Sequence, residues 1–148
     1  MVERLEMPAT GLVWRLSLRW RATIDRAIAP LGLTHAQYAI VAPLRHLSRT
    51  GHRPTQRELA DLTGLEPLYV SKLARALEQA GLVERTGDPV DTRAVRLALT
   101  EHGHDVTTRA VQRVVALQDE LLAPLGGTDS AATAQFVAAI RTLLGEEP

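Results

Sequence analysis

The residues whose pattern most clearly suggests a chemistry lie between Pro67 and Ala80. At about 100° per residue, four apolar side chains share one side of a helix and predict a buried face: Val70, Leu73, Ala74 and Leu77. The opposite face is centred on Leu68, Lys72 and Arg75. Lysine and arginine can donate to guanine O6 and N7, and leucine can contact the thymine methyl group, so this face could read the major groove of DNA. The alternative is an ordinary exposed helix that happens to carry arginine.

The segment before this helix has the signals of another helix and a tight turn. Thr55-Gln-Arg-Glu58 matches a capping box, and Pro54 keeps the chain from becoming helical earlier. We expect this helix to end near Gly64. The short stretch Gly64-Leu65-Glu66 then leads to Pro67, which is tolerated in a first helical turn. Together the two helices predict a helix-turn-helix.

The apolar period changes after Gly81, a residue type typical of a left-handed helix end. Residues 82–85 predict a short strand. A second strand is predicted by the alternation of Val95, Leu97 and Leu99 with less apolar neighbours. The turn-forming residues from Thr86 to Arg93 lie between them, which predicts a β-hairpin with a long polar tip.

Further helices are predicted on both sides of this region. They run over residues 9–29, from the capping box Thr34-His-Ala-Gln37 to about residue 47, from Thr100 to about residue 122, and from residue 129 or 130 onward. The helices over 9–29 and 104–122 each carry two apolar strips, which one small chain does not easily bury. In the last helix we expect four residues to face inward: Phe136, Ala139, Ile140 and Leu143.

The ordered set of segments from Leu31 to Gly103 resembles the MarR family of transcriptional regulators. The resemblance rests on these segments: Leu31-Gly-Leu-Thr-His-Ala-Gln-Tyr38, Thr55-Gln-Arg-Glu-Leu-Ala-Asp-Leu-Thr-Gly64, Val70-Ser-Lys-Leu73, Leu77-Glu-Gln-Ala-Gly-Leu-Val-Glu-Arg85, Asp88-Pro-Val-Asp-Thr-Arg93 and Leu97-Ala-Leu-Thr-Glu-His-Gly103. It implies a mainly α fold with a small β-hairpin wing, a winged helix-turn-helix of six helices in an intertwined homodimer. It further implies one domain over 1–148, with dimerisation helices at 9–29 and 101–145 and a DNA-binding lobe at 34–100.

The resemblance implies a sequence-specific regulator, acting as a repressor, on a pseudo-palindromic double-stranded DNA site. The residues that it assigns to DNA are Leu68, Tyr69, Ser71, Lys72 and Arg75 on the recognition helix, Thr55, Gln56 and Arg57 at a helix N-terminus, and Arg85, Thr86, Asp91 and Arg93 in the hairpin. Helix N-termini favour phosphate, and narrow A·T-rich minor grooves favour an inserted arginine such as Arg93. Asp91 either orients that arginine or is a plain turn residue. Because Glu66-Pro67-Leu68-Tyr69 departs from the more polar run common in the family, the site preference of other members is not transferred.

Composition restricts which classes of partner, site and location are possible. The 17 basic and 17 acidic residues give zero net charge, so charge alone does not indicate a nucleic-acid partner. The absence of cysteine excludes disulfides and thiolate metal sites. No apolar run approaches the roughly 20 residues of a membrane span, and the charged N-terminus lacks a signal segment, so we expect a cytoplasmic protein without membrane contact.

No pattern in the sequence supports catalysis. His102 and His104 would point about 200° apart on a helix, and Asp88 and Asp91 lie in a turn with no implied pocket. Gly-rich phosphate loops and nucleophile motifs are absent from the sequence. We therefore expect no enzyme activity, no metal and no cofactor.

Two questions stay open at this level. The resemblance implies release of DNA by a small aromatic effector, which Trp14, Arg45 and His46 could contact. Dimer packing explains Trp14 better, and a solvated helix end explains Arg45 and His46 better, so no ligand site is assigned. A winged helix can also serve as a protein-interaction module without specific DNA binding, although an acidic or wholly apolar recognition face would favour that more. An activator and a silencer are compatible with the same residues.

Overall fold

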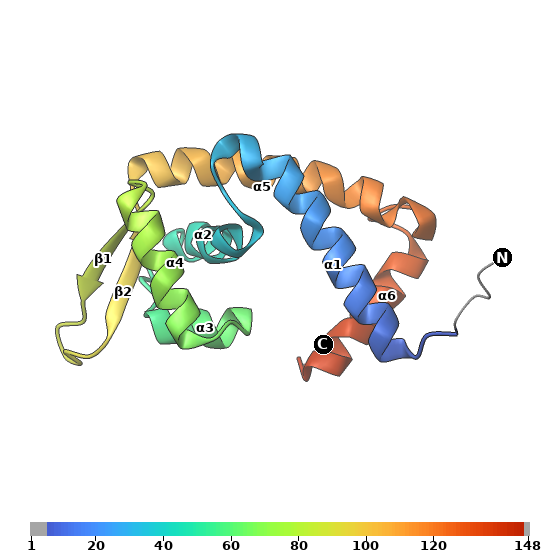
Figure 1. Ribbon diagram of the computed structural model, residues 1–148, viewed down its shortest axis with the longest axis horizontal. Helices are drawn as coiled ribbons and strands as arrows, with labels where there is room; N and C mark the ends of the chain where they lie inside the picture. Colours follow the sequence, from blue (N-terminus) through green and yellow to red (C-terminus); the bar gives the residue numbers. More distant parts are fainter. Residues whose placement is uncertain (1–5, 147–148) are drawn as a thin grey trace. The chain divides into compact units, whose positions relative to one another are not determined.

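The computed structural model describes residues 6–146, which form six α-helices, two 3-10 turns and one two-stranded antiparallel sheet (Figure 1). In chain order the elements are α1 (Ala9–Ile28), η1 (Ala29–Leu31), α2 (His35–Ser48), α3 (Gln56–Thr63), α4 (Pro67–Gln79), β1 (Val83–Gly87), β2 (Val95–Leu99), α5 (Glu101–Leu122), η2 (Ala123–Leu125) and α6 (Ala131–Leu144). Every helix and strand predicted from the sequence is present. The helices in this part of the chain fall short of the length or the apolar character that a bilayer crossing requires.

The chain forms two structural units, and each has its own packing. The winged unit comprises Asp25–Gln112, and the helical unit comprises the chain up to Ile24 together with the chain from Arg113. In the winged unit, α2, α4 and β2 enclose an apolar core whose largest fully buried side chains include Ile28, Ile40, Val41, Leu59, Val70, Leu77 and Leu97. This core holds the helix-turn-helix and the hairpin in one framework.

Local signals fix the ends of the helices in the winged unit. The hydroxyl oxygens of Thr34 and Thr55 accept the N–H groups of Gln37 and Glu58, and both reciprocal capping-box bonds form. Gly64 ends α3 with a φ of +73°, where a side chain would be strained. These features confirm the boundaries that the sequence predicts.

The hairpin joins the core through a defined register. Arg85 lies opposite Leu97, Thr86 opposite Arg96, and Val83 opposite Leu99. Because side chains alternate along a strand, Arg85 shares the inward face with Leu97, while Thr86 and Arg96 share the outer face. The loop between the strands extends away from the helices of this unit (Figure 1).

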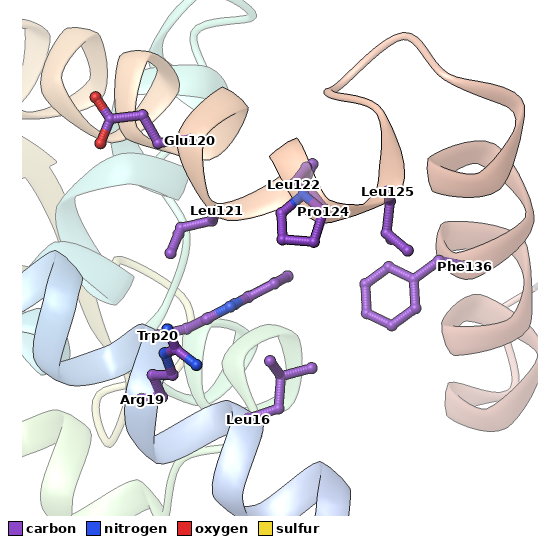
Figure 2. A pocket seen from close by; sticks show the side chains of 9 residues that line it. All are labelled: Leu16, Arg19, Trp20, Glu120, Leu121, Leu122, Pro124, Leu125 and Phe136. Carbon is purple, nitrogen blue, oxygen red and sulfur yellow. The ribbon is translucent and has the colours of Figure 1, made fainter.

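In the helical unit, aromatic residues of α1 and α6 meet beside the end of α5. The rings of Trp20 and Phe136 are 6.1 Å apart with an interplanar angle of 74°, an edge-to-face contact. They line an apolar cavity of about 370 Å³, into which Leu16 also points, whereas the Glu120 carboxylate points away (Figure 2). The end of α5 is tied to the next turn because the Asp119 carboxylate accepts the N–H and the hydroxyl of Thr128, both at 3.0 Å.

The expected inward face of the last helix is only partly present. Phe136 is half-buried, but Ile140 is 38% exposed and Leu143 is 83% exposed, and Ala139 is also exposed. On α1, Val13 and Trp14 are more than half exposed as well. The prediction of an inward face is therefore wrong for Ala139, Ile140 and Leu143 in the single chain, and Phe136 is the member of this face that contacts α1, through Trp20.

Candidate nucleic-acid interface

The two faces of α4 differ as the sequence predicts. Val70, Ala74 and Leu77 are completely buried in the winged unit. On the opposite side Lys72 and Arg75 are exposed, and Leu68 is 87% exposed at the first turn. Packing therefore fixes the helix from behind and leaves two cations and one large apolar side chain directed outward. Of the other candidates on this helix, Tyr69 is 39% exposed and Ser71 is half-buried.

The N-terminus of α3 offers fewer free donors than the sequence suggests. The N–H of Thr55 donates to the Glu58 carboxylate at 2.8 Å, so this amide is already occupied. The same carboxylate lies 3.3 Å from Nε2 of His52. The amides of Gln56 and Arg57 lie in the first turn, where the helix supplies no acceptor. The exposed Arg57 side chain adds a cation at this end.

Arg85 links the sheet to both helices of the helix-turn-helix. Its side chain is only 21% exposed. Nε lies 3.4 Å from Oε1 of Gln56 on α3, and Nη1 lies 3.7 Å from Oε1 of Glu78 on α4. Arg85 is therefore better placed to hold β1 against α3 and α4 than to contact an outside partner. Thr86, its neighbour on the outer face of the hairpin, is exposed.

The start of α3 and the end of the hairpin loop lie together. Gln56, Arg57 and Arg93 line one shallow depression of about 190 Å³ with Thr55, Pro67, Ala94 and Val95. Candidates separated by more than 35 positions in sequence thus share one surface. Arg93 is exposed, and within the described residues its guanidinium has no hydrogen bond to Asp91. The Asp91 carboxylate instead accepts the backbone N–H of Arg93 at 3.0 Å, which favours the turn role for Asp91.

A clasp that the sequence did not predict organises the hairpin loop. The Asp88 carboxylate, 8% exposed, accepts Nε of Arg96 at 2.7 Å and Nη2 at 2.6 Å. Nη1 of the same arginine donates to the Arg53 carbonyl at 2.6 Å. Backbone N–H groups of Val90 and Asp91 donate to Asp88, and together with Arg96 they lower the pKa of this carboxyl. The sequence features that could have indicated this pair are an Asp at the start of a turn and an Arg on the outer face of the following strand.

Comparison with known proteins identifies the chain. Residues 31–94 match the sequence model of the MarR family. A Bacillus subtilis protein named "uncharacterized HTH-type transcriptional regulator YdcH" is 31% identical over 112 residues, which span 76% of each chain. The chain belongs to the MarR family. It is therefore a MarR-family transcriptional regulator, as the resemblance implied.

Solved structures agree with the fold. A MarR-family regulator from Rhodococcus sp. RHA1 is 26% identical and superimposes with a TM-score of 0.79, covering 95% of this chain and 96% of that one. The MepR chain of a Staphylococcus aureus MepR–DNA complex is 22% identical, with a TM-score of 0.83 over 95% of this chain and 98% of that one. The winged helix-turn-helix fold of six helices and a hairpin is thereby confirmed.

The side chains considered for an effector site have other surroundings in this MarR-family chain. Nε of Arg45 donates to the hydroxyl of Thr108 at 3.0 Å, which ties α2 to α5. His46 is exposed. Trp14 is 65% exposed and does not line the cavity of the helical unit. The indole that lines this cavity is that of Trp20. Over residues 6–146, no group of three or more His, Asp or Glu side chains is gathered closely enough to hold a metal ion.

Proposed function

We propose that this regulator is a homodimeric repressor that binds a pseudo-palindromic double-stranded DNA site through α4 and the hairpin. The observation that carries the proposal is the exposed face of α4, where Leu68, Lys72 and Arg75 project from a helix packed rigidly against the core. A helix fits the major groove, and helix-turn-helix proteins present the N-terminal part of the second helix to base edges. Tyr69 and Ser71 lie beside this face and would contact the flanking bases or phosphates.

The surface beside α4 suits the DNA backbone and the minor groove. The amides of Gln56 and Arg57 and the Thr55 hydroxyl lie at the positive end of the α3 dipole, which favours a phosphate. Arg93 on the same surface would enter the adjacent minor groove, with Asp91 shaping its turn. Arg85 would act mainly by holding β1 in place, and Thr86 would face the backbone.

Dimerisation is supported by the apolar residues that the helical unit leaves exposed. On α1 and α6 they include Leu12, Val13, Trp14, Leu18, Leu143 and Leu144, all at least 46% exposed. Many large apolar side chains exposed on two helices are typical of an interface rather than of a monomer in water. A two-fold dimer would present two α4 helices to half-sites about one DNA turn, roughly 10 base pairs, apart.

The proposal has further parts that concern regulation and location. Occupying a promoter would block transcription, and an aromatic small molecule that lowers DNA affinity would relieve the block. The protein would act in the cytoplasm, where a bacterium keeps its DNA, and would perform no catalysis itself.

The test is fluorescence anisotropy with the duplex upstream of the protein's own coding sequence and a scrambled duplex of equal composition, over a series of salt concentrations. The proposal expects tight binding to the upstream duplex alone, with a salt slope that reports several phosphate contacts. The double variant Lys72→Ala/Arg75→Ala should lose the preference between the two duplexes. Arg109→Ala is the matched control, because this arginine is exposed on α5 within the same unit.

Weak and equal binding to both duplexes, unchanged by the double variant, would contradict the proposal. A winged helix that binds protein would behave in this way. Candidate aromatic effectors can be screened in the same assay, where an active compound raises the Kd for the upstream duplex.

A further inference from the structure

Val90 stands at the tip of the hairpin loop as an apolar side chain that is 92% exposed. Single exposed apolar residues are common and by themselves carry no meaning. This one differs because its backbone is held in place: its N–H donates to Oδ1 of Asp88 at 2.8 Å, and the ring of Pro89 restricts the preceding φ. The backbone of Val90 is therefore held in place while its isopropyl group projects into solvent.

The anchor of the tip is the clasp between Asp88 and Arg96. Both guanidinium contacts to the Asp88 carboxylate are shorter than 2.8 Å, and the third arm of Arg96 reaches the Arg53 carbonyl before α3. The N–H of Asp88 also donates to the Ala94 carbonyl at 3.0 Å, which closes the base of the loop. The tip is thus connected to the segment that leads into the helix-turn-helix.

Such rigidity is expected where a surface must bind without first being ordered, because ordering side chains and loops at an interface weakens binding. Proteins that bind the minor groove combine cations with apolar side chains, which pack against its walls or its base steps. Val90 and Arg93 provide this combination within one turn of the same loop.

We propose that Val90 is an apolar minor-groove contact of the wing, packed against the deoxyribose walls beside Arg93, and that the Asp88–Arg96 clasp positions it. This inference rests on the proposed DNA binding. It assigns the two residues different roles in binding. Arg93 is attracted to the negative potential of the minor groove, and Val90 makes an apolar contact whose contribution does not depend on salt.

The test compares Val90→Ala, Val90→Thr and Val90→Ile on the duplex that the wild-type protein prefers. Alanine removes the contact, threonine keeps the shape but makes it polar, and isoleucine keeps the β-branch and the apolar character with one additional methylene. We expect the first two to bind about fivefold more weakly, as loss of part of a buried isopropyl group predicts. Isoleucine should bind as tightly as valine. The salt slope should stay unchanged in all three, whereas Arg93→Ala should reduce it by about one.

A double-mutant cycle tests the clasp. If Asp88 positions Val90, the factor by which Val90→Ala raises the Kd should be at least three times smaller in an Asp88→Ala background than in the wild type. Thermal melts of each variant check that the fold persists at the assay temperature. Val90 is exposed, so its variants should melt near the wild-type temperature, whereas Asp88→Ala should melt lower but remain folded.

The possible outcomes separate the two proposals. If the wild type binds its duplex and the alanine and threonine variants bind equally well, the Val90 contact is overturned while DNA binding stands. Strictly additive losses in the cycle would overturn the positioning role of Asp88. If the wild type prefers no duplex, the proposed function fails and this inference falls with it.

Discussion

Gly103, in the first turn of α5, leaves no room for a side chain. A Cβ at this position would lie 1.9 Å from the carbonyl oxygen of Leu82, where ordinary contacts begin at 3.4 Å. That carbonyl accepts the N–H of Thr100 at 3.1 Å, and the Thr100 hydroxyl donates to the Gly81 carbonyl at 2.6 Å. The close approach therefore joins the start of α5 to the turn that follows α4, so Gly103→Ala must push these two segments apart.

Three contributions set the expected loss in the free energy of unfolding. Forcing an extra methyl group into a packed site costs about 1–3 kcal/mol. Weakening the Thr100 hydrogen bond adds about 1 kcal/mol. Alanine is favoured over glycine within a helix by about 1 kcal/mol, which offsets part of the loss. The net destabilisation should be about 2 kcal/mol, or a drop in Tm of roughly 4–8 °C for a chain of this size.

The assay is a thermal melt followed by circular dichroism, at one fixed protein concentration because association shifts the apparent stability. Gly87→Ala is the matched control, since nothing lies within 4 Å of a Cβ at this position and its φ is not positive. The control should melt at or slightly above the wild-type temperature. Equal melting temperatures for Gly103→Ala and Gly87→Ala would refute the close-packing argument.

Four further outcomes are expected. Arg75→Ala should weaken specific DNA binding by about 1–3 kcal/mol and relax preference at one base position, measured by anisotropy on a set of single-base variants; a uniform loss on every sequence would make Arg75 a phosphate contact. Arg93→Ala should weaken binding most where the flanks are A·T-rich, and equal losses on G·C-rich flanks would remove its minor-groove assignment. Two backbone N–H groups and a paired guanidinium lower the pKa of Asp88 from 3.8. The stability that the ionised Asp88 carboxylate gives to the fold is therefore complete at neutral pH and is lost as the pH falls through the lowered pKa. Asp88→Asn should therefore flatten the decline of Tm below about pH 4, and an unchanged decline would contradict this. Leu143→Glu should shift sedimentation toward the monomer because it places a charge on the exposed apolar face of α6, whereas a wild-type profile would count against that face as the interface.

The boundaries of the elements could be predicted because local chemistry determines them. The capping boxes at Thr34 and Thr55 and the left-handed glycines at Gly64 and Gly81 act within a few residues of chain, so the sequence shows them directly. The two faces of α4 follow equally from helical periodicity. Because the spacing of Val70, Ala74 and Leu77 defines the buried side, it also indicates which residues of this helix point outward.

Features that depend on distant partners could not be predicted. The engagement of Arg85 with Gln56 and Glu78 depends on how β1 packs against α3 and α4, which brings residues 29 and 7 positions away to one guanidinium. The clasp between Asp88 and Arg96 likewise depends on how the loop closes. The sequence predicts an inward Leu143 because periodicity identifies an apolar face without showing what covers it.

The central claim is that two α4 helices read two copies of one half-site. The most direct measurement is selection of bound duplexes from a random library by the purified wild-type protein, followed by sequencing. We predict an inverted repeat whose half-sites lie roughly 10 base pairs apart, centre to centre, and which Lys72→Ala/Arg75→Ala no longer enriches. Failure to enrich any sequence, or enrichment of a motif that the double variant selects equally well, would contradict the account.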